Sequence, residues 1–168
     1  FIEKAQLLNQ MKDAFRLPDE PNRIEAYDIS NIGGALAVGT MAVFTKTESD
    51  KDEYRKFKIK TVKGANDIAM MKEILKRRFS HREWLKPDLI FVDGGVAQLN
   101  TAKEVIAESD LKIPVIAFAK GLQNVFTSSL RKPMALKRLP ERIKNFIVQI
   151  KDEVHRFSIA YHRKLRSK

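Results

Sequence analysis

The sequence contains no cysteine and no long hydrophobic run, and these two absences restrict what the protein can be. Without cysteine, disulfide bonds and thiolate metal sites are excluded, which is typical of a cytoplasmic protein. No apolar stretch approaches the ~20 residues that a membrane-spanning helix needs, so we expect no membrane partner. No signal peptide is visible, and because residue 1 is Phe rather than Met, we expect a fragment of a longer chain.

Acidic residues are in short supply, and the resulting positive charge is concentrated at one end. The 168 residues include 32 Lys and Arg against 21 Asp and Glu, a net charge of +11. Residues 131–168 contain twelve basic residues and three acids, and so carry nine of those charges. A concentrated positive surface attracts a polyanion, most often nucleic acid. A solvated basic surface without a partner remains the alternative.

The spacing of apolar residues predicts a mixed α/β domain behind a lead-in helix. Residues 1–17 place apolar side chains at three- and four-residue steps, and prolines at 18 and 21 end this helix, so residues 1–22 are expected to be a lead-in helix or linker. Three strand-like segments follow with short turns, which indicates an antiparallel meander. Helices then alternate with fully apolar strands, which indicates parallel pairing in a mixed sheet. The expected strands are 23–29, 35–44, 54–61, 89–92 and 115–119, with a small hairpin of 125–127 and 134–136; the expected helices are 66–81, 97–109 and a long one after Pro140.

This order of elements is that of an RNase H-like fold, which we expect residues 23–168 to form as one domain. In the final helix, one apolar stripe is expected to face the core. Its members are Ile143, Phe146, Ile147, Ile150, Val154, Phe157 and Tyr161. Fold alone does not assign function, but it directs attention to acids on the first strand and at the end of the fourth.

Both of these positions hold an aspartate. Asp28 is expected at the C-terminal end of the first strand, and Asp93 ends the apolar strand 89–92. Burying an unpaired carboxylate is costly, and a metal ion removes that cost. Oxygen ligands without cysteine suit Mg²⁺ or Mn²⁺. The alternatives are that Asp28 caps a turn at Ser30 and Asn31, and that Asp93 ends its strand before a glycine turn.

A histidine on the final helix is a candidate third member. Asp152 and His155 are spaced i, i+3 and therefore share a helix face. A lone histidine on a long helix is most often structural. A metal-activated water that attacks a phosphodiester needs metal ligands and a proton acceptor, however, and neutral imidazole can fill either role.

Three stretches of the sequence carry a family resemblance: YDISN (27–31), VDGGVAQLN (92–100) and KDEVHRFSIAYHRKLRSK (151–168). They resemble the DIS, IDGGKGQ-like and DEAHRFAITYHRKKRSK-like motifs of the UvrC family, and the similarity runs from about Arg23 to Lys168. The resemblance implies an RNase H-like DNA endonuclease of nucleotide excision repair that incises 5′ to a lesion. It makes Asp28, Asp93 and His155 the catalytic and metal-binding residues, with Mg²⁺ or Mn²⁺ as cofactor. A further family acid falls on Asp67, which helix capping explains equally well.

The sequence departs from the family pattern at three positions. Val96 and Ala97 stand where the family usually has lysine and glycine, and Asn31 stands where it often has histidine. The lost lysine removes one positive charge near the expected metal.

The resemblance implies damaged double-stranded DNA and a UvrB–DNA pre-incision complex as partners, the latter through segments mostly outside this chain. A monomer is the simplest expectation. Tyr161 and His162 are further candidates for DNA contact. The basic residues expected to hold the DNA are Lys120, Arg156, Arg163, Lys164 and Arg166. The competing readings are a non-catalytic nucleic-acid-binding module on the same scaffold and a protein-interaction domain whose charge serves only solubility.

Overall fold

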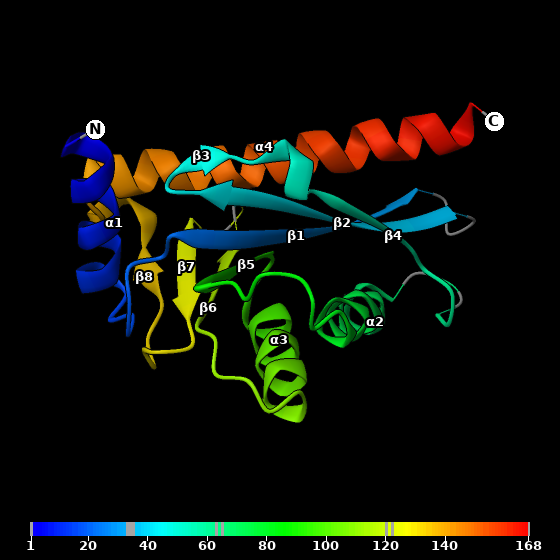
Figure 1. Ribbon diagram of the computed structural model, residues 1–168, viewed down its shortest axis with the longest axis horizontal. Coiled ribbons are helices and arrows are strands. Elements are labelled where there is room, and N and C mark those ends of the chain that lie inside the picture. The colour runs from blue at the N-terminus through cyan, green and yellow to red at the C-terminus, as the bar shows by residue number, and fades with distance from the viewer. Residues whose placement is uncertain are drawn as a thin grey trace.

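A mixed sheet forms the centre of the molecule. The computed structural model describes residues 2–32, 36–62, 64, 66–119, 121 and 123–167. Within these residues the strands follow the order β3-β2-β1-β5-β6-β7-β8, and β4 pairs with β2 beyond the end of β3 (Figure 1). The strands are β1 (Arg23–Ile32), β2 (Leu36–Thr45), β3 (Glu48–Ser49), β4 (Arg55–Lys58), β5 (Leu89–Asp93), β6 (Val115–Ala119), β7 (Asn124–Thr127) and β8 (Met134–Ala135).

The pairing follows the predicted pattern of a meander followed by parallel strands. β1 and β2 pair antiparallel from Arg23↔Thr45 to Ile32↔Leu36. β5 then pairs parallel with β1, and β6 pairs parallel with β5. The parallel strands are five residues long and buried at four of those five positions, which explains their uninterrupted apolar sequence. The expected hairpin is confirmed as the antiparallel pair β7 and β8.

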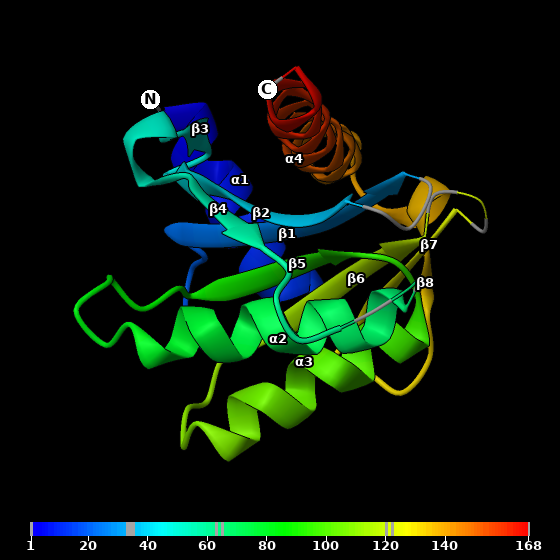
Figure 2. The same ribbon diagram turned by 90° about the vertical axis from the view of Figure 1, so that its right-hand side faces the viewer.

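Helices cover both faces of the sheet. Figures 1 and 2 show α4 (Glu141–Arg166) along one face, and α2 (Asp67–Ser80) and α3 (Val96–Glu108) side by side on the other. Asn66 caps α2, because its side chain accepts a hydrogen bond from the Ala69 backbone N–H at 3.0 Å. No helix of the described residues is long and apolar enough to cross a membrane.

The buried stripe of α4 follows the prediction only as far as Val154. Beyond it, Ser158 and His162 are buried at 0% and 2% exposure, whereas Phe157 and Tyr161 are only partly buried. The apolar pattern missed this shift because the buried positions are occupied by polar residues. Phe157 and Tyr161 instead lie at the flank of α4, where the Lys56 ammonium group sits 5.7 Å and 5.1 Å from their ring centres.

The N-terminal segment is packed onto the domain. α1 (Ile2–Ala14) forms as expected, and the residues at and after its end are among the most buried of the chain. Met11, Phe15 and Leu17 are at most 6% exposed and belong to the same core cluster as the apolar face of α4. The segment before residue 22 therefore contributes to the core, while its role as a linker between domains stays a prediction.

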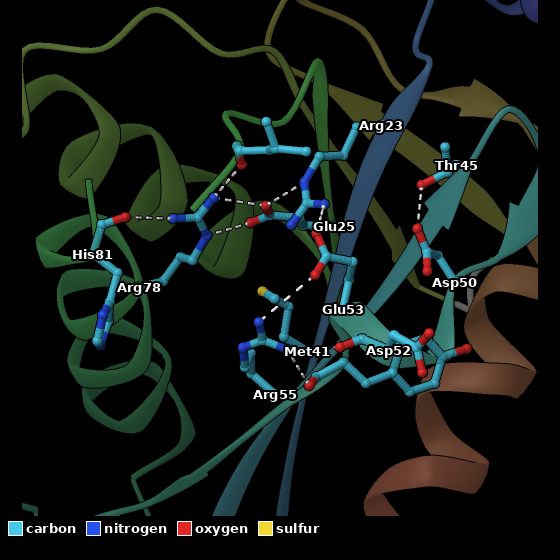
Figure 3. A network of polar contacts seen from close by, with 12 residues as sticks. Arg23, Glu25, Met41, Thr45, Asp50, Asp52, Glu53, Arg55, Arg78 and His81 are labelled. Carbon is cyan, nitrogen blue, oxygen red and sulfur yellow. Dashed lines mark hydrogen bonds and ion pairs between the residues drawn. The ribbon is translucent and has the colours of Figure 1, made fainter. Parts of the chain in front are cut away.

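A buried ionic network ties β1 to α2 on the face opposite α4 (Figure 3). Glu25 is 0% exposed, and its carboxylate accepts hydrogen bonds from Arg78 Nε at 2.7 Å and Arg78 Nη2 at 2.8 Å. Arg23 Nε donates to the same carboxylate at 3.1 Å, and Tyr27 Oη donates to it at 2.6 Å. Burial, followed by the charge of Glu25, raises the pKa of Tyr27 well above its usual value, so the phenol stays a donor. The network fixes β1 in place from behind.

Candidate metal-binding active site

Two aspartates meet where β1 and β5 run side by side. The parallel pairing of these strands ends at Tyr27↔Val92, so Asp28 and Asp93 are the next residue of each strand. Side chains alternate along a strand, and Ala26 and Phe91 both pack in the cluster under α4. Asp28 and Asp93 therefore point to the α4 face of the sheet.

The position of Asp28 within its strand differs from the prediction. β1 continues to Ile32 because β2 pairs with it along ten residues, so Asp28 lies inside the strand and not at its end. The turn-capping alternative for Asp28 is wrong for the same reason, since Ser30 and Asn31 are strand residues.

Asp28 is costly to ionise in this position. Asp28 is 7% exposed, and its burial, followed by the negative charge of Asp93, raises its pKa to about 6. His155 and Lys151 act in the opposite direction. His155 Nδ1 lies 3.4 Å from Asp28 Oδ2, and Lys151 Nζ donates to Asp93 Oδ1 at 2.8 Å. Four groups from three elements thus form a compact charged cluster.

The glycine turn after β5 sets the direction of the chain at Asp93. Gly94 has φ +144°, and a Cβ there would come within 2.4 Å of the Gln98 side chain. Its N–H donates to the Phe118 carbonyl at 3.0 Å. Gly95 N–H donates to Gln98 Oε1 at 2.9 Å. This hydrogen bond caps the N-terminus of α3, which follows the turn directly. Gly94 is therefore needed to end β5 at Asp93 and begin α3 three residues later, at Val96.

The carboxylate oxygens and the imidazole nitrogen of this cluster are of the types that bind a divalent ion. Their side chains do not converge on a single point in this structure. Among the described residues, no three His, Asp or Glu side chains stand together in an arrangement that could hold a metal ion. Burial, followed by the charge of Asp93, raises the pKa of Asp28, and a cation beside the two carboxylates would offset the cost of ionising it. The His155 side chain is 59% exposed and lies beside Asp28, so it is open to solvent at the edge of the cluster.

Asp67 stands apart from this cluster. It is the exposed first residue of α2, where an acid is favoured by the helix dipole. Within the described ranges, no hydrogen bond or ion pair joins it to Asp28, Asp93 or His155.

The expected DNA-binding residues differ in their exposure and in whether they already form ion pairs within the protein. Lys120 lies outside the described residues. Arg156 is engaged by Glu153, with hydrogen bonds of 2.7 Å and 2.8 Å. The expectation of a DNA contact at His162 is not supported, because that side chain is only 2% exposed. The exposed cations near the end of α4 are Arg163, Lys164 and Arg166.

Lys151 is the member of the cluster that the sequence reasoning missed. It precedes His155 by four residues, so the two side chains lie on one side of α4. That spacing alone is not distinctive in the sequence, and the contact with Asp93 is what singles out this lysine. The lysine was overlooked because it is one of many basic residues in the final segment.

The sheet order, the single long helix across one face and the paired aspartates at adjacent parallel strands define an RNase H-like α/β domain. Residues 12–159 match the UvrC RNAse H endonuclease domain, and the chain belongs to this family. The fold and the family expected from the sequence are thereby confirmed.

Similar proteins include longer bacterial proteins named UvrABC system protein C. The UvrABC system protein C of Chlorobium chlorochromatii (strain CaD3) is 44% identical over 163 residues, which cover 95% of this chain and 26% of that protein. The protein of the same name from Clostridium tetani (strain Massachusetts / E88) is 42% identical over 183 residues, covering 96% of this chain and 29% of its own length. The chain thus spans less than a third of the curated relatives it matches.

Solved structures with a similar arrangement include endonuclease V of Ciona intestinalis in complex with a DNA containing inosine. It is 15% identical, with a TM-score of 0.43, and the match covers 70% of this chain and 57% of that one. Human ENDOV is 14% identical with a TM-score of 0.39, covering 93% of this chain and 97% of that one.

Proposed function

We propose that this domain is a divalent-metal-dependent DNA endonuclease that makes the 5′ incision of nucleotide excision repair. The observation that carries the proposal is the pair Asp28 and Asp93 on adjacent parallel strands, with His155 Nδ1 3.4 Å from Asp28. Two carboxylates and an imidazole on one sheet face are suited to hold Mg²⁺ or Mn²⁺. Membership of the UvrC endonuclease family supports the choice of reaction.

In this mechanism Asp28 and Asp93 would hold the ion, and His155 would complete the site as a ligand or as the base for the attacking water. The ion, when bound, polarises a phosphate oxygen and lowers the pKa of a bound water. β1 and β5 hold Asp28 and Asp93 as neighbours on one face of the sheet. The Glu25–Arg78 hydrogen bonds anchor β1, the strand that carries Asp28, to α2. His155 is exposed, and so it is accessible to water and to substrate.

The substrate in this proposal is damaged double-stranded DNA, held through its backbone. Arg163, Lys164 and Arg166 extend beyond His155 along α4 and contribute a sequence-independent electrostatic attraction. Such contacts do not recognise a lesion. Lesion choice therefore belongs to the partner that delivers the DNA, which we propose to be a UvrB–DNA pre-incision complex, because the curated relatives are named for the UvrABC system. A monomeric, cytoplasmic domain remains our expectation.

Cleavage of supercoiled plasmid DNA tests the proposal. The wild-type domain, Asp93→Ala and the control Asp19→Ala, which removes an exposed acid, are incubated with Mg²⁺, Mn²⁺ or EDTA. We expect nicking by the wild type and the control in the presence of metal, and loss of at least ~10²-fold in Asp93→Ala, since one of two carboxylate ligands is gone. Nicking that continues in EDTA, or that survives Asp93→Ala, contradicts the proposal.

The second candidate function is a non-catalytic nucleic-acid-binding module. The concentration of positive charge in residues 131–168 favours it. It predicts salt-dependent DNA binding without cleavage and without metal binding, whereas the endonuclease predicts all three properties. A degenerate site would be expected to have lost one of Asp28, Asp93 and His155, and all three are present.

A further inference from the structure

A cavity of about 420 Å³ lies between the first half of α3 and the connection from β7 to β8. Figure 2 shows these two segments as neighbours. The volume falls within the roughly 300–1,000 Å³ of pockets that hold small organic ligands. Asp28, Asp93, His155 and the basic end of α4 do not line it. The cavity is therefore a second candidate site, which the mechanism above leaves unused.

The charged side chains that line this cavity in the described part of the chain are all cationic. Lys103 belongs to α3, and Arg131 and Lys132 belong to the β7–β8 connection. All three residues are exposed, and no hydrogen bond or ion pair joins any of them to a carboxylate of the described residues. Arg156, in contrast, is already paired with Glu153. The three cations are therefore available to attract an anionic group.

The rest of the lining suits an organic group better than a bare anion. Leu99 is buried, Phe126 is half-buried and Val96 is 49% exposed, so the cavity has an apolar wall. Asn100 and Ser129 are exposed and add neutral hydrogen-bonding groups. A nucleotide combines an anionic phosphate with a base whose flat faces pack against apolar side chains. Sites for unpaired nucleotides combine cations with aromatic or apolar residues for this reason.

The wall formed by the β7–β8 connection is anchored to the sheet. Ser128 Oγ accepts a hydrogen bond from the Val115 N–H at 2.9 Å, and the Ser128 N–H donates to the Val115 carbonyl at 2.9 Å. Phe126, two residues earlier, packs against the core cluster under α2 and α3. The cavity is thus formed before a ligand arrives, which lowers the entropic cost of binding.

We propose that this cavity binds one unpaired nucleotide of a single-stranded DNA segment, with Lys103, Arg131 and Lys132 attracting its phosphate and the apolar wall receiving its base. A base inside a duplex is stacked and paired and cannot enter such a pocket, whereas an unpaired base can. The cavity therefore distinguishes single-stranded from double-stranded DNA, which the surface cations at the end of α4 do not.

The cavity lies on the face of the sheet opposite the candidate metal site. Asp28 and Asp93 point to the α4 face, whereas Phe126 packs with the cluster under α2 and α3. Val96 follows Asp93 by only three residues, so the two sites are close along the chain. The nucleotide held in the cavity is therefore distinct from the one whose phosphate is cut. The inference goes beyond the proposed function, because binding at the cavity requires no metal.

Fluorescence anisotropy in EDTA tests the inference with three labelled DNA probes that share one duplex. The first is blunt, the second has a short single-stranded overhang of thymidines, and the third has the same overhang with abasic sugars, which keep the phosphates but lack bases. We expect the wild type to bind the thymidine overhang about fivefold or more tighter than either of the other two probes, because a base that packs on apolar side chains adds affinity.

Two sets of variants place this preference in the cavity. The triple variant Lys103→Gln, Arg131→Gln and Lys132→Gln should lose the preference for the overhang, and its control carries the same change of charge at the exposed residues Lys76, Lys86 and Lys112. Asn100→Asp adds a negative charge to the cavity without changing the size of the side chain, and should weaken the preference. The identical substitution at the exposed Asn9 of α1 is its control.

Thermal unfolding confirms that each variant is folded, and the outcomes then separate this inference from the proposed function. A wild type that binds the three probes equally overturns the inference. Folded cavity variants that keep the full preference overturn it as well. Loss of metal-dependent cleavage without loss of the overhang preference overturns the proposed function and leaves the nucleotide site in place.

Discussion

Arg78 of α2 donates two hydrogen bonds to Glu25 of β1, at 2.7 Å and 2.8 Å, and both side chains are at most 3% exposed. Glu25 lies three residues before Asp28, and its side chain is on the opposite face of the same strand. The buried ion pair therefore anchors β1, which carries Asp28, from the face of the sheet opposite the candidate site.

The first prediction concerns this pair. Glu25→Leu leaves Arg78 buried without its partner, and we expect a loss of about 3–5 kcal/mol in the free energy of unfolding. The double variant Glu25→Leu/Arg78→Met removes both charges and should lose less than the sum of the single variants. Urea unfolding of the four proteins measures the coupling. The exposed pair Lys76–Glu108, at 3.8 Å, is the control and should show a coupling of about 0–1 kcal/mol; equal couplings for the two pairs contradict the prediction.

The second prediction follows from the pKa of Asp28. The folded value of about 6 lies above the ordinary value of 3.8, so the contribution of this group to stability is complete below pH 3.8 and is lost as the pH rises through 6. In EDTA, Asp28→Asn should therefore unfold at a higher temperature than the wild type at pH 7.5, by on the order of 5 °C. The difference should shrink as the pH falls from 6 to 4. Asp19→Asn, at an exposed site, should show no such trend, and a difference that is constant with pH contradicts the assignment.

The third prediction concerns the basic end of α4. The triple change Arg163→Gln, Lys164→Gln and Arg166→Gln should weaken duplex binding and reduce the slope of log K against log salt by ~0.9 for each phosphate contact that is lost. A fluorescence titration in EDTA at several salt concentrations measures the slope. The control with the same change of charge, made at the exposed residues Lys76, Lys86 and Lys112, should keep the wild-type slope. Equal slopes for the two triple variants would remove α4 from the DNA interface.

The fourth prediction concerns Val96, one of the positions at which the sequence departs from the motif that it resembles. Val96 is the first residue of α3, is 49% exposed, and lines a cavity of about 420 Å³ with Arg131 and Lys132. Val96→Lys should strengthen DNA binding several-fold at low salt, while the unfavourable helix dipole costs about 0.3–1 kcal/mol in stability. Val96→Gln adds polarity without charge and should bind as the wild type does. Equal binding by Val96→Lys and Val96→Gln contradicts the electrostatic explanation.

Much of the fold could be predicted from the sequence because its elements have clear periods. β6 has the predicted bounds, and α2, α3 and β5 lie within about one residue of theirs. The end of β1 could not be predicted, because residues 30–32 are held in the strand by their pairing with β2 and not by their own apolar pattern. The buried Ser158 and His162 were missed for a related reason, since tertiary packing and not hydropathy places them inside.

The candidate site was predicted in part. Asp28 and Asp93 were found because an acid within or after an apolar strand is costly, and the structure brings both to one face. Lys151 required the structure, because a lysine at one turn from a histidine has no distinctive pattern until its partner on β5 is known. The metal and its ligands stay a prediction.

A Mn²⁺ titration of the metal-free domain, comparing the wild type with Asp93→Asn and Asp28→Asn, tests the central claim most directly, because it does not depend on segments outside this chain. The account predicts saturable binding by the wild type at pH 7.5 and at least a tenfold loss of affinity in each variant, while Asp19→Asn binds normally. Wild-type protein that binds no Mn²⁺, or variants that bind it as tightly as the wild type, would contradict the claim that Asp28 and Asp93 form a metal site.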